Sequence, residues 1–387
     1  MNRLIGSIII ISLFFYGCVA DQKIDEIINR FRTEYVGDLR EHVFDISYER
    51  LGGFSVILRG ETDNSEVKIQ LLDTLRSHGF QIQDSIIVLP HNVSQPWALI
   101  DLSVATMRSK ASHTAPVVSQ GLMGMPVKIL KEDGGWAFIQ TPDRYLGWCE
   151  KAALCFVDSI RLMEWKKSPR VMITSRSTTI KDVETGKICG DVVAGCLLEE
   201  VERDGNKIVV KTPSGIIGYV LKDEVSSFNQ KDFPPEVNPQ KLKNTALNFI
   251  RTPYLWGGTS VHALDCSGFI KTVYRLQGIE LARDASLQAR YGQLIPVNQG
   301  WTLFQTGDLL FFAPRKGSKK ITHVGMYLGD SEFIHEAGKV KVNSLDSTRS
   351  NFSSFRKLTL VKARRVLQNF DSEGIVPLLE HPWYIEK

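Results

Sequence analysis

The sequence predicts a multidomain protein of the α+β class, and three observations support this fold class. The chain has 387 residues, which is too long for one ordinary hydrophobic core and enough for about three or four domains. Two segments, beginning at Gly124 and Gly195, repeat one pattern of short alternating strands and tight turns. After residue 241 the composition becomes apolar and aromatic, and a helical pattern is followed by strands.

The composition is that of a globular protein, with 43% hydrophobic and 23% charged residues. The net charge of +4 is small for this length, and no basic run is long enough to indicate a nucleic-acid-binding tract. We therefore expect no nucleic-acid partner. The oligomeric state is not predicted.

Residues 1–20 are typical of an export signal, because one arginine precedes an apolar run from Leu4 to Tyr16 that is too short to span a membrane. Cleavage before Cys18 would leave a lipid-anchored protein, whereas cleavage after Ala20 would release an unanchored one. No second apolar run of about 20 residues follows, so we expect no transmembrane segment after signal removal. The expected location is the periplasm or the cell envelope.

Residues 21–100 predict a small α+β domain. An amphipathic helical pattern over 24–36 comes first, and alternating strands then flank a turn at Gly52-Gly53. A second helical pattern ends at Gly79, and a strand follows over 83–90. No catalytic signature lies in this region.

The two repeats align without a gap, with Asp133-Gly134 over Asp204-Gly205 and Thr141-Pro142 over Thr212-Pro213. Short strands joined by tight turns predict a small β-barrel for each copy. The pattern resembles bacterial SH3-like domains, which accompany cell-wall enzymes; plain spacers are the alternative. The predicted segments are 101–160 and 168–228 for the two barrels, 229–241 for a proline-rich linker, 242–370 for the last domain and 371–387 for a tail.

Six cysteines bear on the chemistry, and Cys18 belongs to the signal. In an oxidising compartment Cys149 could pair with Cys155, and Cys189 with Cys196. Cys266 would then stay unpaired, which makes it a candidate reactive thiol. Alternatively, the first four are small hydrophobic core residues.

The stretch LDCSGFI places Cys266 in the first turn of a predicted helix that Asp265 or the preceding residue caps. The free N–H groups and the helix dipole favour a thiolate there. Such a nucleophile also needs a base. The alternative is that Cys266 is a structural residue of the hydrophobic core.

Two histidines downstream are candidates for that base. His323 lies in the predicted strand THVGMYLG and His335 in the next one, FIHEA. Neighbouring strands bring side chains to about 5 Å, so a thiol, an imidazole and a second, orienting imidazole would form a triad. A metal site is disfavoured because no third ligand is organised around the histidines. We expect no cofactor.

The motifs PYLWGG, LDCSGFI, GDLLFF, ITHVGMYLG and FIHEAG resemble the NlpC-type branch of papain-like cell-wall cysteine peptidases, over about 240–367. The resemblance implies a papain-like α+β domain with Cys266 as nucleophile, His323 as base and His335 as the orienting residue. Tyr254 would help to stabilise the oxyanion, and Trp256 would form a pocket wall; a core aromatic is the alternative for Tyr254.

SH3-like domains before such a peptidase resemble the γ-D-glutamyl-L-diamino acid endopeptidases, which cut murein stem peptides that carry a free L-Ala amine. The resemblance implies that Asp284, in LARDASLQA, pairs with the substrate ammonium; a helix cap is the alternative. Asp265 and Ser267 would line the substrate site, with Ser286 as a further candidate.

The first barrel departs from that pattern, because Pro116 stands where a glutamate is expected to contact the peptide. Tyr145 can still supply the expected tyrosine. The predicted function is hydrolysis of the γ-D-Glu–diamino acid bond of murein stem peptides, with lysine and diaminopimelate both left open. Alternatives are an endopeptidase or amidase on intact wall, an acyltransferase with the same triad, and a non-catalytic wall-binding protein.

Overall fold

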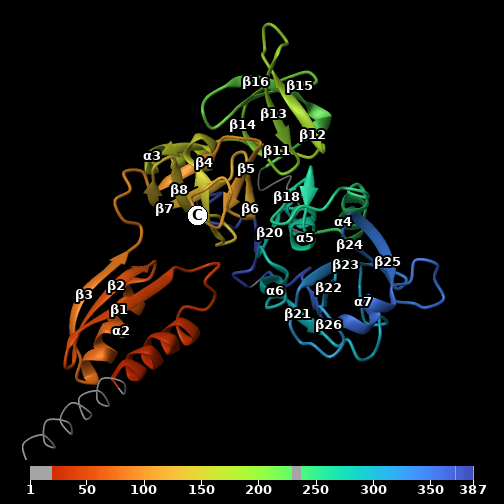
Figure 1. Cartoon of the computed structure of the whole chain (residues 1–387). Coiled ribbons are helices and arrows are strands. Elements are labelled where there is room, and N and C mark those ends of the chain that lie inside the picture. Colours follow the sequence, from red (N-terminus) through yellow and green to blue (C-terminus); the bar gives the residue numbers. More distant parts are fainter. Residues whose placement is uncertain (1–19, 229–236, 371, 387) are drawn as a thin grey trace, which may run out of the picture. The chain divides into compact units, whose positions relative to one another are not determined.

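The computed structural model describes residues 20–228, 237–370 and 372–386, and the chain forms two compact units, Met1–Ser94 and Gln95–Lys387 (Figure 1). Cys18 and nearly all of the expected signal segment lie outside the described residues. Among the helices that the structure describes, none is both long and apolar enough to cross a membrane.

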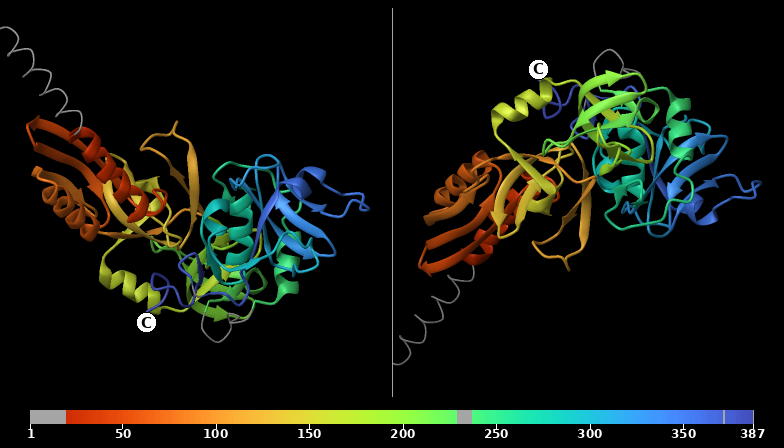
Figure 2. Two further views of the ribbon diagram at one scale, coloured as in Figure 1. Left: turned by 90° about the horizontal axis from the view of Figure 1, so that it is seen from below. Right: turned by 90° about the horizontal axis from the view of Figure 1, so that it is seen from above.

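The first unit is a three-stranded sheet with helices packed on one face (Figure 2). Its described elements are a helix over 20–34, β1 (Phe44–Gly52), β2 (Ser55–Thr62), α2 (Ser65–Ser77) and β3 (Gln81–Val88). β1 pairs antiparallel with β2, and β3 is parallel to β2. A hairpin is found where Gly52-Gly53 predicts one: Gly52 ends β1 and pairs with Ser55, and Gly53 has a positive φ in the turn.

The second unit begins with two seven-stranded sheets. The first repeat comprises β4 (Trp97–Ile100), β5 (Val104–Arg108), β6 (Val117–Leu122), β7 (Pro126–Asp133), β8 (Trp136–Gln140), β9 (Leu146–Glu150), the 3-10 turn η1 (Lys151–Ala153) and β10 (Leu154–Val157). After α3 (Ser159–Lys167), the second repeat comprises β11 (Arg170–Ile173), β12 (Ser177–Lys181), β13 (Ile188–Val193), β14 (Leu197–Asp204), β15 (Lys207–Lys211), β16 (Ile217–Leu221), η2 (Lys222–Glu224) and β17 (Val225–Ser227).

The two repeats share one topology. The strand order is β10-β4-β7-β8-β9-β5-β6 in the first and β17-β11-β14-β15-β16-β12-β13 in the second. Both carry a register shift at the same place, between Ile129 and Lys131 and between Glu200 and Glu202. The repeat that the sequence predicts is therefore a repeat of the backbone, including its irregularities.

The cysteines of the repeats do not form the expected disulfides. Cys149, Cys155, Cys189 and Cys196 are all free thiols. Cys149 and Cys196 are fully buried, and burial raises the pKa of their thiols to about 12 and about 11. They therefore act as small hydrophobic core residues, which is the alternative that the sequence left open.

The last region is built around a six-stranded sheet of order β21-β26-β22-β23-β24-β25, with α5 against one face (Figure 1). Its elements are α4 (Pro239–Leu247), β18 (Thr259–Ser260), β19 (Ala263–Leu264), α5 (Cys266–Arg275), β20 (Ile279–Leu281), α6 (Ala285–Gln288), β21 (Gln293–Ile295), β22 (Leu309–Phe312), β23 (His323–Gly329), β24 (Glu332–Glu336), β25 (Val340–Ser344), α7 (Ser354–Thr359), β26 (Leu360–Arg365) and β27 (Ile375–Pro377).

The boundaries of this region differ from the expected ones. Helix α4 begins at Pro239, inside the expected linker, because the side chain of Asn238 caps it and proline is well suited to the first helical position. The expected tail is part of the fold: β27 pairs with β20, and Tyr384 is fully buried against Trp165 of α3. The C-terminal segment thus holds the first repeat and the last region together.

Candidate active site

Helix α5 places Cys266 at its first residue, as the sequence predicts. Asp265 is the N-cap, and its Oδ1 accepts a hydrogen bond from the Gly268 N–H at 2.7 Å. A Cβ on Gly268 would lie 2.0 Å from the Gly258 carbonyl oxygen, so only glycine allows this helix start to pack against the PYLWGG loop. The thiol is therefore held at a fixed, closely packed helix start.

The ionisation of Cys266 differs from the expectation. Burial and the Asp265 carboxylate raise the pKa of the thiol to about 12, and they outweigh the helix dipole. The resting thiol is therefore protonated at neutral pH. It needs a base close by in order to act as a nucleophile.

The two histidines lie together on adjacent antiparallel strands. His323 begins β23, His335 lies on β24, and His323 Nε2 is 2.7 Å from His335 Nδ1. Burial lowers the pKa of His335 to about 3, and burial together with Arg356 holds the pKa of His323 well below its usual range. Both rings are therefore neutral at pH 7, as a general base must be.

Strand β23 also reaches the thiol. The backbone N–H of Val324, the residue after His323, faces the sulfur of Cys266 and lowers the pKa of the thiol, although burial outweighs this effect. The first residues of β23 and the start of α5 therefore meet, and the structure brings the predicted nucleophile and base into one site.

Tyr254 and Trp256 lie on the loop before α5. Tyr254 forms a backbone bridge with Leu264, and its side chain is 39% exposed. Burial, and next the neighbouring Cys266, raise the pKa of the Tyr254 hydroxyl to about 12, so it stays a proton donor beside the thiol. Trp256 is 70% exposed and is free to contact a ligand rather than the core.

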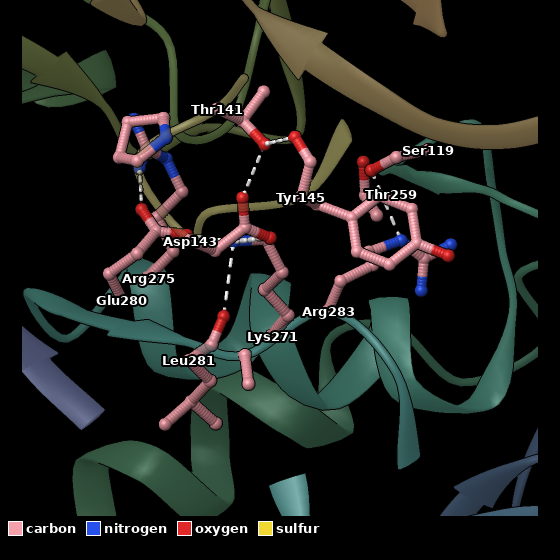
Figure 3. A network of polar contacts seen from close by, with 12 residues as sticks. Ser119, Thr141, Asp143, Tyr145, Thr259, Lys271, Arg275, Glu280, Leu281 and Arg283 are labelled. Atoms are coloured by element: carbon pink, nitrogen blue, oxygen red, sulfur yellow. Dashed lines mark hydrogen bonds and ion pairs between the residues drawn. The ribbon is translucent and has the colours of Figure 1, made fainter. Parts of the chain in front are cut away.

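Asp265 and Ser267, expected to line the substrate site, belong instead to a buried network around Arg283. The Arg283 guanidinium donates to both Asp265 oxygens at 3.1 and 2.5 Å and to Ser267 Oγ at 3.0 Å. Its Nε donates to Ser119 Oγ of the first repeat at 3.1 Å (Figure 3). Because both carboxylate oxygens are engaged, we assign Asp265 to positioning the start of α5.

Tyr145 and Asp284 meet across the first repeat and the last region. The Tyr145 hydroxyl lies 3.1 Å from Asp284 Oδ2. Asp284 is the residue before α6, but its side chain makes no capping hydrogen bond, so the alternative of a side-chain cap is not what the structure shows. Ser286 is half-buried nearby in the chain, and Pro116 is exposed just before β6.

A second network ties the catalytic helix to the first repeat (Figure 3). Lys271 of α5 is buried between Asp143, at 3.0 Å, and Glu280. Glu280 also pairs with Arg275 at 2.6 Å, and Arg275 Nη1 lies 3.0 Å from the Tyr384 hydroxyl. The orientation of α5 is thus coupled to the turn that carries Tyr145.

The sequence interpretation misses three polar residues of this site: Arg283, Lys271 and Asn343. For Arg283, the only hint in the sequence is its position next to Asp284, and this hint is weak. Lys271 has none, because a lysine on an amphipathic helix is normally exposed. Asn343 hydrogen-bonds to His335 at 2.9 Å, and only the register of β24 and β25 reveals this contact.

Comparison with known families agrees with this architecture. Residues 251–359 match the NlpC/P60 family, and residues 107–154 match the bacterial dipeptidyl-peptidase SH3 domain. The last region is an NlpC/P60 domain. The predicted fold class, a multidomain α+β chain with an SH3-like domain before such a peptidase domain, is confirmed.

Two curated relatives match this chain with moderate identity. The chain is 29% identical to dipeptidyl-peptidase 6 of Lysinibacillus sphaericus, over 64% of this chain and 92% of that protein. It is 29% identical to a γ-D-glutamyl-L-lysine dipeptidyl-peptidase of Bacillus cereus, over 56% of this chain and 66% of that protein. The crystal structure of an NlpC/P60 family protein from Bacillus cereus superposes with a TM-score of 0.62 at 25% identity, covering 70% of this chain and 99% of that one.

Proposed function

We propose that this protein is a cysteine peptidase that hydrolyses the γ-D-Glu–diamino acid bond of murein stem peptides and releases L-Ala-γ-D-Glu. The observation that carries the proposal is the Tyr145–Asp284 contact. It puts a carboxylate and a hydroxyl together where the first repeat meets the domain that holds Cys266 and the histidines. The names of the relatives, dipeptidyl-peptidases specific for γ-D-glutamyl bonds, support the same reaction.

In the proposed reaction His323 removes the thiol proton, and the Cys266 sulfur attacks the γ-carbonyl carbon of D-Glu. The C–N bond then breaks, His323 returns the proton to the leaving amine, and a thioester remains on Cys266. Water, deprotonated by His323, hydrolyses the thioester. The Cys266 backbone N–H and the Tyr254 hydroxyl stabilise the oxyanion, and one such donor contributes about 3–4 kcal/mol.

Substrate selection follows from Asp284. Its carboxylate is half-buried beside Tyr145, where a free L-Ala ammonium can pair with it. A charge-assisted hydrogen bond of this kind contributes about 1.5–3 kcal/mol. An N-acylated peptide, as in intact wall, has no ammonium that could pair with this carboxylate. Pro116 supplies no second carboxylate, so Asp284 carries this selection.

The proposed site of action is the cell envelope, where murein peptides occur. The N-terminal apolar run supports export, with either lipid anchoring at Cys18 or release after Ala20.

Two synthetic peptides test the proposal. One is L-Ala-γ-D-Glu-diamino acid with a free amine, and the other is the same peptide N-acetylated. Wild-type protein, Cys266→Ala and Asp284→Asn are incubated with each, and products are identified by mass spectrometry. We expect cleavage of the free peptide alone, loss in Cys266→Ala, and reduced discrimination in Asp284→Asn. Cleavage of neither peptide by the wild type would refute the proposed function.

A further inference from the structure

A chain of hydrogen bonds runs from the backbone through Asn343 to the histidine pair. Asn343 Nδ2 lies 2.9 Å from the Asn351 carbonyl oxygen, and Asn343 Oδ1 lies 2.9 Å from His335 Nε2. A peptide carbonyl only accepts hydrogen bonds, so the amide nitrogen must face Asn351. The orientation of the Asn343 side chain is thereby fixed, with its oxygen toward His335.

This orientation determines where the protons of both histidines lie. Asn343 Oδ1 only accepts, so His335 Nε2 must carry a hydrogen. In a neutral ring His335 Nδ1 is then an acceptor, and its partner at 2.7 Å, His323 Nε2, must donate. The remaining ring nitrogen of the pair, His323 Nδ1, carries a lone pair.

We infer that Asn343 is a positioning residue that fixes the tautomers of His335 and His323, so that His323 Nδ1 presents its lone pair to the Cys266 thiol. The inference rests on the proposed function for its catalytic meaning. Without Asn343, each ring could flip or change tautomer, and a proton on His323 Nδ1 would block the transfer from sulfur. Asn343 is thus a fourth residue beside the triad of Cys266, His323 and His335, and it acts through His335.

The surroundings favour a neutral pair. The charged groups whose fields reach the two rings are Arg356, from α7, and Lys341, from β25. Both are cations and, with burial, they oppose protonation of the pair. The aromatic rings of Phe312 and Phe333 pack against the imidazoles and leave few other polar partners. Asn343 is a neutral hydrogen-bond acceptor for this pair, and it therefore determines the tautomers.

Two variants of the full chain test this. Asn343→Leu keeps the side-chain size but removes the acceptor, whereas Asn343→Asp keeps an acceptor toward His335. We expect Asn343→Leu to lose about 10- to 100-fold in kcat with little change in KM, as for other groups that fix a histidine tautomer. Asn343→Asp should retain at least tenfold more activity than Asn343→Leu, and the acidic limb of its pH profile should move to higher pH, because a carboxylate favours the protonated pair. Asn369→Leu, a matched change elsewhere in the chain, should leave kcat unchanged.

A substrate-free measurement separates this inference from the proposed function. Nitrogen-15 NMR of histidine-labelled wild-type protein at pH 7, assigned with His323 and His335 variants, reports which ring nitrogens carry protons. We expect protons on Nε2 of both rings in the wild type and mixed tautomers in Asn343→Leu. A proton on His323 Nδ1 in the wild type, or wild-type kcat and pH profile in Asn343→Leu, would overturn the inference. If Asn343→Leu fails to fold, the wild-type spectrum and Asn343→Asp still decide it. If the peptides are not cleaved at all, the proposed function fails while the spectrum alone decides the tautomers.

Discussion

The two repeats share one backbone fold but differ in the side chains of one turn. In the first repeat, Thr141 N donates to the Tyr145 carbonyl at 3.0 Å; in the second, Thr212 N donates to the Ile216 carbonyl at 2.9 Å. The turn of the first repeat presents Asp143 and Tyr145, both buried against the NlpC/P60 domain. At the equivalent place the second repeat presents Ser214 and an Ile216 that is 46% exposed.

This comparison shows how a duplicated scaffold acquires a site. The backbone hydrogen bonds hold the turn in both copies, so the side chains are free to differ. In the first copy Asp143 binds Lys271 of the catalytic helix, and Tyr145 meets Asp284. The function that we propose for the first repeat therefore lies in two side chains rather than in its fold. The following predictions test this division between scaffold and site, from the largest expected effect to the smallest.

The NlpC/P60 domain holds the proposed chemistry, so removal of its base should have the largest effect. We expect His323→Ala to lower kcat by about 10⁴-fold or more, because the Cys266 thiol then has no base to remove its proton. Stopped or discontinuous assays on the free-amine peptide would measure this. The matched variant His262→Ala, an exposed histidine, should keep wild-type kcat. Near-normal turnover in His323→Ala would place the base elsewhere.

The buried contact between the first repeat and α5 should dominate stability. Lys271→Met leaves Asp143 buried without its paired cation and leaves Glu280 paired with Arg275 alone, which should cost about 3–5 kcal/mol of unfolding free energy. Urea denaturation followed by circular dichroism measures the loss. Lys167→Met removes an exposed pair with Glu386 and should cost less than about 1 kcal/mol. Equal effects of the two substitutions would show that the buried network does not hold the repeat in place.

Glu336 provides a pH-dependent test within the NlpC/P60 domain. It is fully buried, neither of its oxygens has a hydrogen-bond partner among the described residues, and burial raises the pKa of its carboxyl to about 7. Because the folded-state pKa lies above the unfolded value of 4.5, the free energy of unfolding falls as pH rises from there to about 7 and then levels off. Glu336→Gln should therefore be more stable than wild type at pH 8, by up to about 3 kcal/mol, and equally stable at pH 4.

Thermal unfolding of Glu336→Gln across that pH range would show the effect. Glu184→Gln, at an exposed turn of the second repeat, serves as the control and should have the stability of the wild type at both pH 4 and pH 8. A constant difference between Glu336→Gln and wild type at every pH would argue against ionisation as the cause.

The smallest effect is expected from removing the hydroxyl of Tyr145, whose equivalent in the second repeat is Ile216. Tyr145→Phe removes the contact with Asp284 but keeps the ring, so kcat/KM for the free-amine peptide should fall by roughly fivefold, the equivalent of about 1 kcal/mol. A substitution at the equivalent position of the second repeat, Ile216→Ala, should leave kcat/KM unchanged. A similar fall in kcat/KM for both variants would mean that the repeats influence the site through their fold rather than through the Tyr145 hydroxyl.

The sequence predicts the parts of the site that carry a local signal. Cys266 follows a capping pattern, and His323 and His335 lie in short apolar segments typical of buried strands, so their elements could be assigned before the structure was known. The contacts of the first repeat could not, because Tyr145 and Asp284 are 139 residues apart and meet only through packing between domains. Asn343 likewise depends on strand register, and the free thiols of the repeats depend on which faces the strands bury.

The most direct test of the central claim is to trap the covalent intermediate on Cys266. Wild-type protein is mixed with the free-amine peptide, quenched in acid within one turnover, digested and analysed by mass spectrometry. The account predicts that the fragment containing Cys266 gains the mass of an L-Ala-γ-D-Glu acyl group, and that Cys266→Ala forms neither adduct nor product. Release of the dipeptide by Cys266→Ala, or an adduct on another residue, would contradict it.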